Sequence, residues 1–206
     1  MIVYKEMEQR SDDWFKLRLG TITGTRLKDV FKSNNLPLID ELIAEELTGL
    51  TPPPIYVNDA MQRGIDLEPI AMDSYIKREF AEVETPAFVR NSDIDFLGFS
   101  PDGLVKKDDK YVGGVEIKCP SSKKHIEYIR TNKVPNEYKY QVLSYFINCE
   151  DLEYVDFISY DDRVAFKPMN VVRVTRVEWA DMIDETVAGI NKFNEKREKY
   201  FKQITE

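Results

Sequence analysis

Two carboxylates and a lysine stand at spacings that could support metal-dependent chemistry. Asp102 precedes the segment Glu116-Ile117-Lys118, and each carboxylate lies in a stretch whose composition favours a β-strand. Side chains alternate along a strand, so Glu116 and Lys118 are expected on the same face. Mg²⁺ prefers oxygen ligands and usually takes one or two carboxylates, with waters and phosphate oxygens completing its shell. The pattern therefore predicts metal-assisted phosphodiester hydrolysis in which the lysine meets the attacking water.

The same residues also have a simpler interpretation. A surface hairpin with a cross-strand ion pair would contain the same residue types, because a Glu-x-Lys pattern is common by chance. A third carboxylate, Glu68, follows Gly64 on a predicted helix, although this signal is weak alone. The spacing and the predicted strands favour the hydrolase over the hairpin.

The composition limits the classes of protein and of site. The chain has 206 residues, which suits a single domain with a substantial core. Two cysteines and one histidine, His125, cannot supply a four-ligand zinc or iron–sulfur site or a histidine pair. The cysteine usage fits a reducing cytoplasm, Met1–Glu6 lacks the apolar core of a signal peptide, and no apolar run could span a bilayer. We therefore expect a cytoplasmic protein without a membrane anchor.

The net charge of −8 is unusual for a protein that binds nucleic acid, but basic residues cluster locally. Binding depends on where charges lie rather than on their sum. The clustered basic residues are Arg10, Lys16, Arg18, Arg26, Lys28 and Lys32, then Lys123, Lys124, Arg130 and Lys133. Each cluster could be a solvated helix face, and the cluster at 123–133 could equally contact a phosphate backbone.

The predicted elements alternate between helices and strands, which indicates an α/β sheet flanked by helices. Helices are expected at residues 12–19, from 23 or 25 to 31, and at 38–48, 59–80, 121–131, 137–149 and 177–201. Strands are expected at 83–89, 96–105, 111–119, 153–159 and 171–174, with a hairpin turn at 106–110. Pro69 should kink or restart its helix, and residues 51–54 should form a stiff connector.

We expect one domain over residues 1–206. It would comprise a helical part at about 1–82, a catalytic sheet core at about 83–175 and a C-terminal helix at about 177–201.

Two further polar signals lie outside the central group. Arg18 and Thr25 flank a predicted helix, turn and helix, and an arginine, a hydroxyl and backbone N–H groups can hold a terminal phosphate. Taken alone, an arginine such as Arg18 is more often a surface salt-bridge partner. Gln141 lies on an apolar helix, where a structural hydrogen bond is the alternative to a functional role.

Together the motifs resemble the lambda exonuclease / YqaJ-type viral recombinase family, a branch of the restriction-endonuclease-like nucleases. The matching segments, in order, are Arg…Thr at 18–25, Gly-x-x-x-Glu at 64–68, Ser-Pro-Asp-Gly at 100–103, Glu-x-Lys-Cys-Pro at 116–120 and Gln-x-x-x-Tyr at 141–145. The resemblance implies a restriction-endonuclease-like core with a mixed central β-sheet flanked by α-helices.

The resemblance also implies an activity and partners. It implies a Mg²⁺-dependent 5′→3′ exonuclease that degrades one strand of linear double-stranded DNA and leaves a 3′ single strand for a phage-type annealing protein. Mn²⁺ should substitute, with one or two ions per site. A homotrimer ring around the DNA is implied as well, and it would need basic residues only in its channel. For a phage-encoded protein the compartment would be the host bacterial cytoplasm.

The resemblance assigns roles at the metal centre. Asp102 and Glu116 would bind the metal with the Ile117 carbonyl, Lys118 would orient or deprotonate water, and Glu68 would support the metal–water network.

It also assigns roles around the DNA end. The residues placed around a 5′-phosphate are Arg18, Thr25, Ser100 and Gln141. Thr25 stands where serine appears in lambda exonuclease, which keeps the hydroxyl. Met61 lies where the family carries an apolar wedge that separates the terminal base pair. A further family aspartate could correspond to either Asp93 or Asp95.

Two other functions stay open at the level of sequence. The same core could form a dimeric endonuclease, which would release internal fragments rather than mononucleotides. Alternatively, the chain could be a non-catalytic DNA-end-binding or assembly protein, although the intact Asp…Glu-x-Lys set argues against that function.

Overall fold

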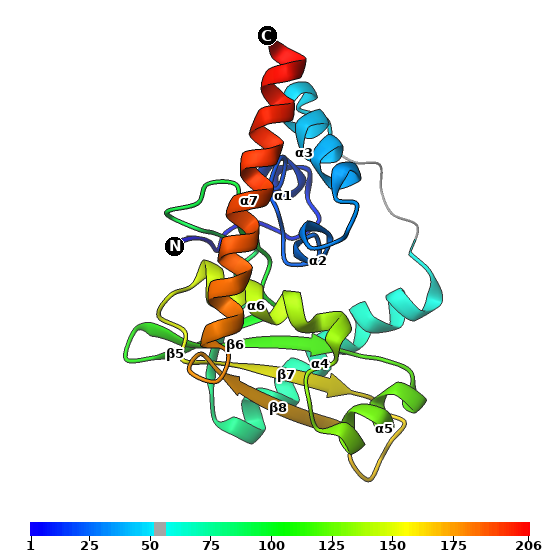
Figure 1. The fold of residues 1–206 in the computed structure, drawn as a ribbon. Helices are drawn as coiled ribbons and strands as arrows, with labels where there is room; N and C mark the ends of the chain where they lie inside the picture. The colour runs from blue at the N-terminus through cyan, green and yellow to red at the C-terminus, as the bar shows by residue number, and fades with distance from the viewer. Residues whose placement is uncertain (52–56) are drawn as a thin grey trace.

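A computed structural model describes residues 1–51 and 57–206, and it places two β-sheets among helices (Figure 1). The larger sheet has the strand order β2-β5-β6-β7-β8, and its members are β2 (Glu82–Glu84), β5 (Gly103–Lys107), β6 (Lys110–Lys118), β7 (Tyr154–Tyr160) and β8 (Met169–Thr175). Strands β6 and β7 pair in parallel and the other neighbours pair antiparallel, so the sheet is mixed, as predicted. The smaller sheet, β1-β3-β4, consists of β1 (Ile2–Tyr4), β3 (Phe88–Arg90) and β4 (Gly98–Phe99).

Helices cover both faces of the larger sheet. In chain order they are α1 (Asp12–Leu17), α2 (Leu27–Val30), α3 (Leu36–Thr48), α4 (Asp59–Glu79), α5 (Ser122–Thr131), the 3₁₀ turn η1 (Asn136–Tyr138), α6 (Lys139–Asn148) and α7 (Ala180–Thr205). On one face, Leu67 and Met72 of α4 join the core that contains Val115 and Ile158. Helix α6 contributes Val142 and other buried residues to the core on the opposite face.

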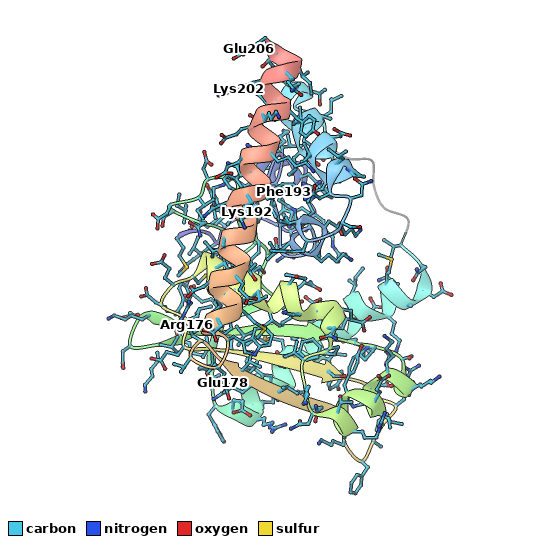
Figure 2. All side chains as sticks on the ribbon, viewed as in Figure 1. Arg176, Glu178, Lys192, Phe193, Lys202 and Glu206 are labelled. Carbon is cyan, nitrogen blue, oxygen red and sulfur yellow. The ribbon has the colours of Figure 1, made fainter. Side chains whose placement is uncertain are left out.

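The long helix α7 runs from the sheet to the far end of the molecule, where it lies beside α3 (Figures 1 and 2). Phe193, midway along it, is buried, and Arg197 approaches Glu46 of α3. Within the described ranges, no helix combines the length and the apolar character needed to cross a membrane.

Two predicted strands are each divided in two. The stretch predicted as a strand at 83–89 forms β2 and β3, which belong to different sheets, and Pro86 lies between them. The stretch predicted at 96–105 forms β4 and β5, with Pro101 between them. Proline has no N–H to donate to a ladder, so strand pairing ends at each of these sites. Asp102 therefore lies in the bend before β5, and its predicted place within a strand is wrong.

The helix boundaries also correct the prediction in places. Helix α4 continues through Pro69 without a restart, because residues on both sides of the proline, Leu67 and Ala71, are buried against the sheet. The second helix begins only at Leu27, since residues before it form a turn in which Thr23 accepts from two backbone N–H groups. Helix α3 ends at Gly49 with a positive φ, as predicted.

Other differences lie at the ends of the chain. Strand β1 is not predicted, and the C-terminal helix begins at Ala180 and extends to Thr205. The connector predicted at 51–54 lies almost entirely outside the described residues.

Candidate active site

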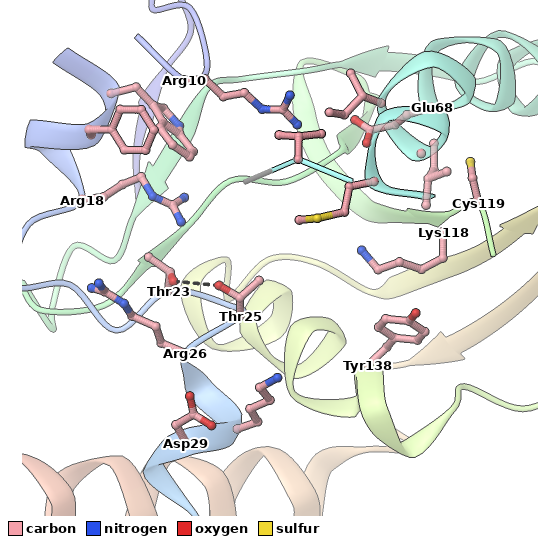
Figure 3. Close-up of a pocket in the computed structure, with 18 of the residues that line it drawn as sticks. Arg10, Arg18, Thr23, Thr25, Arg26, Asp29, Glu68, Lys118, Cys119 and Tyr138 are labelled. Atoms are coloured by element: carbon pink, nitrogen blue, oxygen red, sulfur yellow. Dashed lines mark hydrogen bonds between the residues drawn. The ribbon is translucent and has the colours of Figure 1, made fainter. Parts of the chain in front are cut away.

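A cleft of about 940 Å³ opens between the end of β6, the first part of α4 and the N-terminal loops (Figure 3). Figure 3 shows Arg10, Arg18 and Lys118 directed into it from different sides. Six residues singled out from the sequence line this cleft, namely Arg18, Thr25, Met61, Glu68, Ile117 and Lys118. The structure therefore brings proposed metal-site, phosphate-site and wedge residues to one place.

Asp102 and Glu116 lie next to the cleft, because they contact Ile117 and Lys118, the β6 residues that line it. The Ile117 N–H donates to Asp102 Oδ2 at 2.6 Å, and Lys118 Nζ lies 2.6 Å from Glu116 Oε1. Glu116 is only 3 % exposed, so its carboxylate is nearly removed from water. The ion pair confirms that Glu116 and Lys118 share a face of the strand.

The Tyr145 hydroxyl ties the two carboxylate-bearing segments together. It accepts from the Asp102 N–H at 3.0 Å, lies 2.5 Å from the Val115 carbonyl oxygen and 3.0 Å from Glu116 Oε2. Its single proton can serve either oxygen. The ring reaches this position because Gly114 has no side chain, and a Cβ there would collide with it. Tyr145 therefore fixes the bend before β5 against β6.

The surroundings disfavour ionisation of Asp102 and Glu68. Burial raises the pKa of Asp102 well above its ordinary value, and the negative charges of Glu116 and Glu68 add to the effect. Burial also raises the pKa of Glu68. Burial disfavours the charge on Lys118, but Glu116 and Asp102 hold the pKa of its ammonium group above the ordinary value. Lys118 is therefore a cation in this state and neutralises the carboxylates around it.

The donor set fits a hard divalent cation. Among residues 1–51 and 57–206, no cluster of three or more His, Cys, Asp or Glu side chains could hold a metal by itself. Mg²⁺ does not require such a cluster, since it commonly combines one or two carboxylates with other oxygens and retained waters. Glu116 Oε1 is buried and lies 2.6 Å from the Lys118 ammonium group, but it accepts no well-aligned hydrogen bond from the described residues. That oxygen, together with Asp102 and the adjacent Ile117 carbonyl, suits an oxygen-seeking metal ion.

The opposite wall of the cleft is built around Arg18. Its Nη1 donates to Ser100 Oγ at 3.0 Å, and its guanidinium carbon lies 4.0 Å from the centroid of the Trp14 ring. Ser100 Oγ in turn donates to the Ala87 carbonyl at 2.8 Å. Burial, reinforced by the charge of Arg26, lowers the pKa of Arg18 to about 10. Within the described chain Arg18 has no carboxylate partner, so the salt-bridge alternative is wrong.

The other two proposed phosphate residues form a separate pair. Thr25 borders both the cleft and a small neighbouring pocket of about 40 Å³, and Gln141 and Lys28 line that smaller pocket. The Thr25 hydroxyl lies 3.3 Å from the hydroxyl of Thr23. The four residues thus fall into two groups: Arg18 is hydrogen-bonded to Ser100, whereas Thr25 and Gln141 line the smaller pocket.

The remaining residues singled out from the sequence differ in their placement. Met61 is 44 % exposed at the cleft, so it is not a core methionine. Asp93 and Asp95 are exposed in the connection between β3 and β4 and do not line the cleft, and the Asp95 carbonyl accepts a hydrogen bond from Arg90.

Two residues of the cleft, Tyr138 and Arg10, were not assigned a role from the sequence alone. The Tyr138 ring centroid lies 5.3 Å from Lys118 Nζ, and nothing in its local sequence marks it. Arg10 adopts a φ of 71°, which non-glycine residues rarely adopt, and its side chain lines the cleft. Its only sequence signal is membership of the N-terminal basic cluster.

Comparison with known proteins agrees with this geometry. The sequence matches the YqaJ-like viral recombinase domain over residues 13–149. The chain belongs to this family. No curated protein matches it significantly.

Solved structures give the fold and a more specific relative. An alkaline exonuclease (LHK-Exo) from Laribacter hongkongensis shares 32 % identity and a TM-score of 0.83, covering 95 % of this chain and 96 % of its own. LHK-Exo in complex with dAMP matches at 32 % identity and a TM-score of 0.77, covering 95 % and 98 %. A phage-related exonuclease from Haemophilus somnus 129PT, at 14 % identity and a TM-score of 0.55 over 90 % and 95 %, shares the fold. The restriction-endonuclease-like fold is thereby confirmed, and the matches support a DNA-degrading nuclease.

Proposed function

We propose that this YqaJ-family chain is a Mg²⁺-dependent 5′→3′ exonuclease. It degrades one strand of linear double-stranded DNA and leaves a 3′ single-stranded overhang for recombination by strand annealing. The observation that carries the proposal is the shared cleft, in which Lys118 and its carboxylate neighbours face Arg18, a half-buried arginine with no carboxylate partner among the described residues. One wall suits hydrolysis of a phosphodiester and the other suits capture of a terminal phosphate.

Asp102, Glu116 and the Ile117 carbonyl would hold the metal in this proposal. When bound, a divalent ion would activate water and stabilise charge on the phosphate and the leaving oxygen. Glu68 lies on the same side of the cleft as Lys118 and would accept a hydrogen bond from water at the site (Figure 3). Mg²⁺ is proposed because every donor is an oxygen, and Mn²⁺ should substitute.

Lys118 would orient the attacking water rather than deprotonate it. Its pKa is held above the ordinary value while the carboxylates around it are uncompensated, so it carries a proton and can only donate hydrogen bonds. An ammonium group beside the reacting phosphate would also stabilise the negative charge that develops there.

Arg18 would bind the 5′-phosphate of the strand being degraded. A guanidinium can donate two parallel hydrogen bonds to a phosphate, and the Ser100 bond and the Trp14 ring hold this one in a fixed orientation. Thr25, Ser100 and Gln141 would add hydroxyl and amide contacts on the same wall. Met61 would separate the terminal base pair from its exposed position at the cleft.

The assembly that we propose is a homotrimeric ring that encloses DNA and hands the 3′ strand to an annealing protein. Support comes from the contrast between a net charge of −8 and the local basic clusters, since a ring requires basic residues only in its channel.

Digestion of a linear duplex, labelled at one 5′ end, in Mg²⁺ or in EDTA tests the proposed function. We expect labelled mononucleotide as the first product in Mg²⁺ and none in EDTA, with a trimer mass by light scattering of the same sample. Internal fragments and a dimer mass would favour the endonuclease instead. DNA binding without cleavage under both conditions would favour a non-catalytic end-binding protein.

A further inference from the structure

The first part of α4 forms a wall of the cleft, although it has no hydrophobic anchor. Residues 59–66, about two turns of helix, include no buried side chain, and Leu67 is the first buried residue of α4. Met61, Gly64 and Ile65 of this stretch nevertheless line the cleft. Burial of apolar side chains normally fixes a helix to its sheet. Some other interaction must therefore hold this part of the wall.

Arg63 supplies that interaction. Its Nη2 donates to Asp161 Oδ1 at 2.7 Å and to Asp162 Oδ1 at 2.8 Å, and its Nη1 donates to the carbonyls of Pro120 at 3.2 Å and Cys119 at 3.4 Å. The other side-chain hydrogen bonds made by residues 58–66, those of Asn58 and Gln62, stay within the helix.

These partners lie at one end of the sheet because of its topology. Strands β6 and β7 run parallel, with Lys118 opposite Ser159, so their C-terminal ends are adjacent. Cys119 and Pro120 directly follow Lys118, and Asp161 directly follows β7. A single guanidinium thus joins α4 to the ends of both strands, next to the lysine of the proposed active site.

Asp161, the buried partner of Arg63, has a second arginine partner. Asp161 is fully buried, and Arg163 also donates to it. Burial opposes its ionisation, but hydrogen bonds from Arg163 and Ser122 hold the pKa of Asp161 well below its ordinary value. Asp161 therefore stays an anion and keeps a cation partner when Arg63 is removed, so loss of Arg63 should not unfold the protein.

We propose that Arg63 is a positioning residue that clamps the start of α4 to the ends of β6 and β7, and so holds Met61 at the mouth of the cleft. This role rests on the proposed function, because it concerns how a duplex end meets the active site. Arg63 touches no reacting atom in this account. It acts through the placement of the cleft wall.

A second arginine bound to a buried carboxylate provides a control. Arg173 donates to Asp156 at 2.8 and 2.7 Å, and the Tyr75 hydroxyl of α4 donates to the same carboxylate at 2.7 Å. Asp156 is fully buried, like Asp161, and it also belongs to the β7 region. Arg173→Ala therefore removes an arginine near the other end of α4, away from the cleft, and leaves Asp156 with the Tyr75 hydroxyl.

Hydrogen exchange tests the clamp itself. In Arg63→Ala we expect amides 62–66 to exchange at least about 10-fold faster while residues 67–79 stay protected, because only the unanchored turns open locally. Arg173→Ala should leave residues 62–66 as in the wild type. Wild-type protection of residues 62–66 in Arg63→Ala, or equal loosening of the whole helix, would overturn the proposal.

Digestion of two DNA substrates tests whether loss of Arg63 impairs the handling of a paired duplex end. We expect Arg63→Ala to lose about 10-fold in kcat/KM on a blunt duplex, and markedly less on a duplex whose terminal base pairs are mismatched, because a small misplacement of a positioning group is costly. Met61→Ala should show the same pattern, and the double variant should add little. Arg63→Lys should rescue only in part, since an ammonium cannot reach all four acceptors at once.

The two proposals can fail separately. An equal loss on both substrates, matched by Arg173→Ala, would reduce Arg63 to a general stabilising role and overturn its positioning role. A wild-type protein that degrades no DNA would instead refute the proposed function, while the exchange comparison would still decide whether Arg63 is a clamp.

Discussion

The two walls of the cleft hold their charged groups in opposite ways. On the sheet wall, burial and the nearby charge of Glu116 make ionisation of Asp102 harder. On the helical wall, Arg18 is held by a hydroxyl and an aromatic ring, with no carboxylate partner in the described chain. One wall therefore has negative charge that the protein only partly compensates, and the other has a positive charge left available.

This difference indicates what each wall is built to receive. Buried carboxylates that repel one another are costly unless a cation compensates them, and Lys118 does so only with its single charge. A half-buried guanidinium such as that of Arg18, with no counter-ion among the described residues, is costly for the same reason, and an anion would relieve that cost. The proposed ligands, a metal ion on the sheet wall and a phosphate on the helical wall, would offset both costs.

On the helical wall, we expect Arg18→Ala to cause the largest loss of activity. Loss of a charged hydrogen-bonding group should slow digestion of 5′-phosphorylated duplex by about 10- to 100-fold. The preference for a 5′-phosphate over a 5′-hydroxyl should shrink with it, whereas Arg18→Lys should recover only part because it lacks the planar fork.

Initial rates on the two end types, with Lys77→Ala as a control for an exposed cation outside the cleft, measure the effect of Arg18. Equal rates on both ends for the wild type, together with a silent Arg18→Ala, would remove Arg18 from phosphate binding.

A smaller effect, on stability, is expected on the sheet wall from Asp102→Asn. The folded-state pKa of Asp102 is raised, so above the ordinary aspartate pKa the folded state keeps a proton that the unfolded chain releases. Stability of the metal-free wild type should therefore fall as pH rises from that ordinary value towards the raised one. Asp102→Asn should flatten this fall by a few degrees in Tm, since about 1 kcal/mol shifts Tm by roughly 2–4 °C at this size.

Melting curves of both proteins in EDTA, from about pH 4 to pH 8, measure the difference in its pH dependence. In the wild type, added Mg²⁺ should raise Tm most at the upper end of the range, where the carboxylates are ionised. Parallel pH profiles for the two proteins would show that Asp102 is not under this strain.

Local sequence patterns anticipated the parts of the site that depend on local geometry. Strand alternation is enough to place Glu116 and Lys118 on one face, and a glycine is enough to end α3 at Gly49. Proline was harder to interpret, because Pro101 ends a strand whereas packing on both sides carries α4 through Pro69.

Contacts between distant segments could not be predicted in this way. Tyr145 joins Asp102 and Glu116 from a helix, and Arg63 meets a carboxylate 98 residues later in the chain. Both contacts depend on which strands lie side by side, and no local pattern encodes that order. The parallel pairing of β6 with β7 decides where these partners meet.

The central claim is tested most directly by calorimetric titration with Mn²⁺ in the absence of DNA. The proteins to compare are the wild type, Glu116→Gln and Lys118→Ala. We expect Glu116→Gln to bind at least about 10-fold more weakly than the wild type, because it loses a charged ligand. Lys118→Ala should bind at least as well as the wild type, since it removes the competing cation, although its DNA cleavage should fall by about 10³-fold. Equal affinity in the wild type and Glu116→Gln, or loss of binding in Lys118→Ala, would contradict a metal site on the sheet wall.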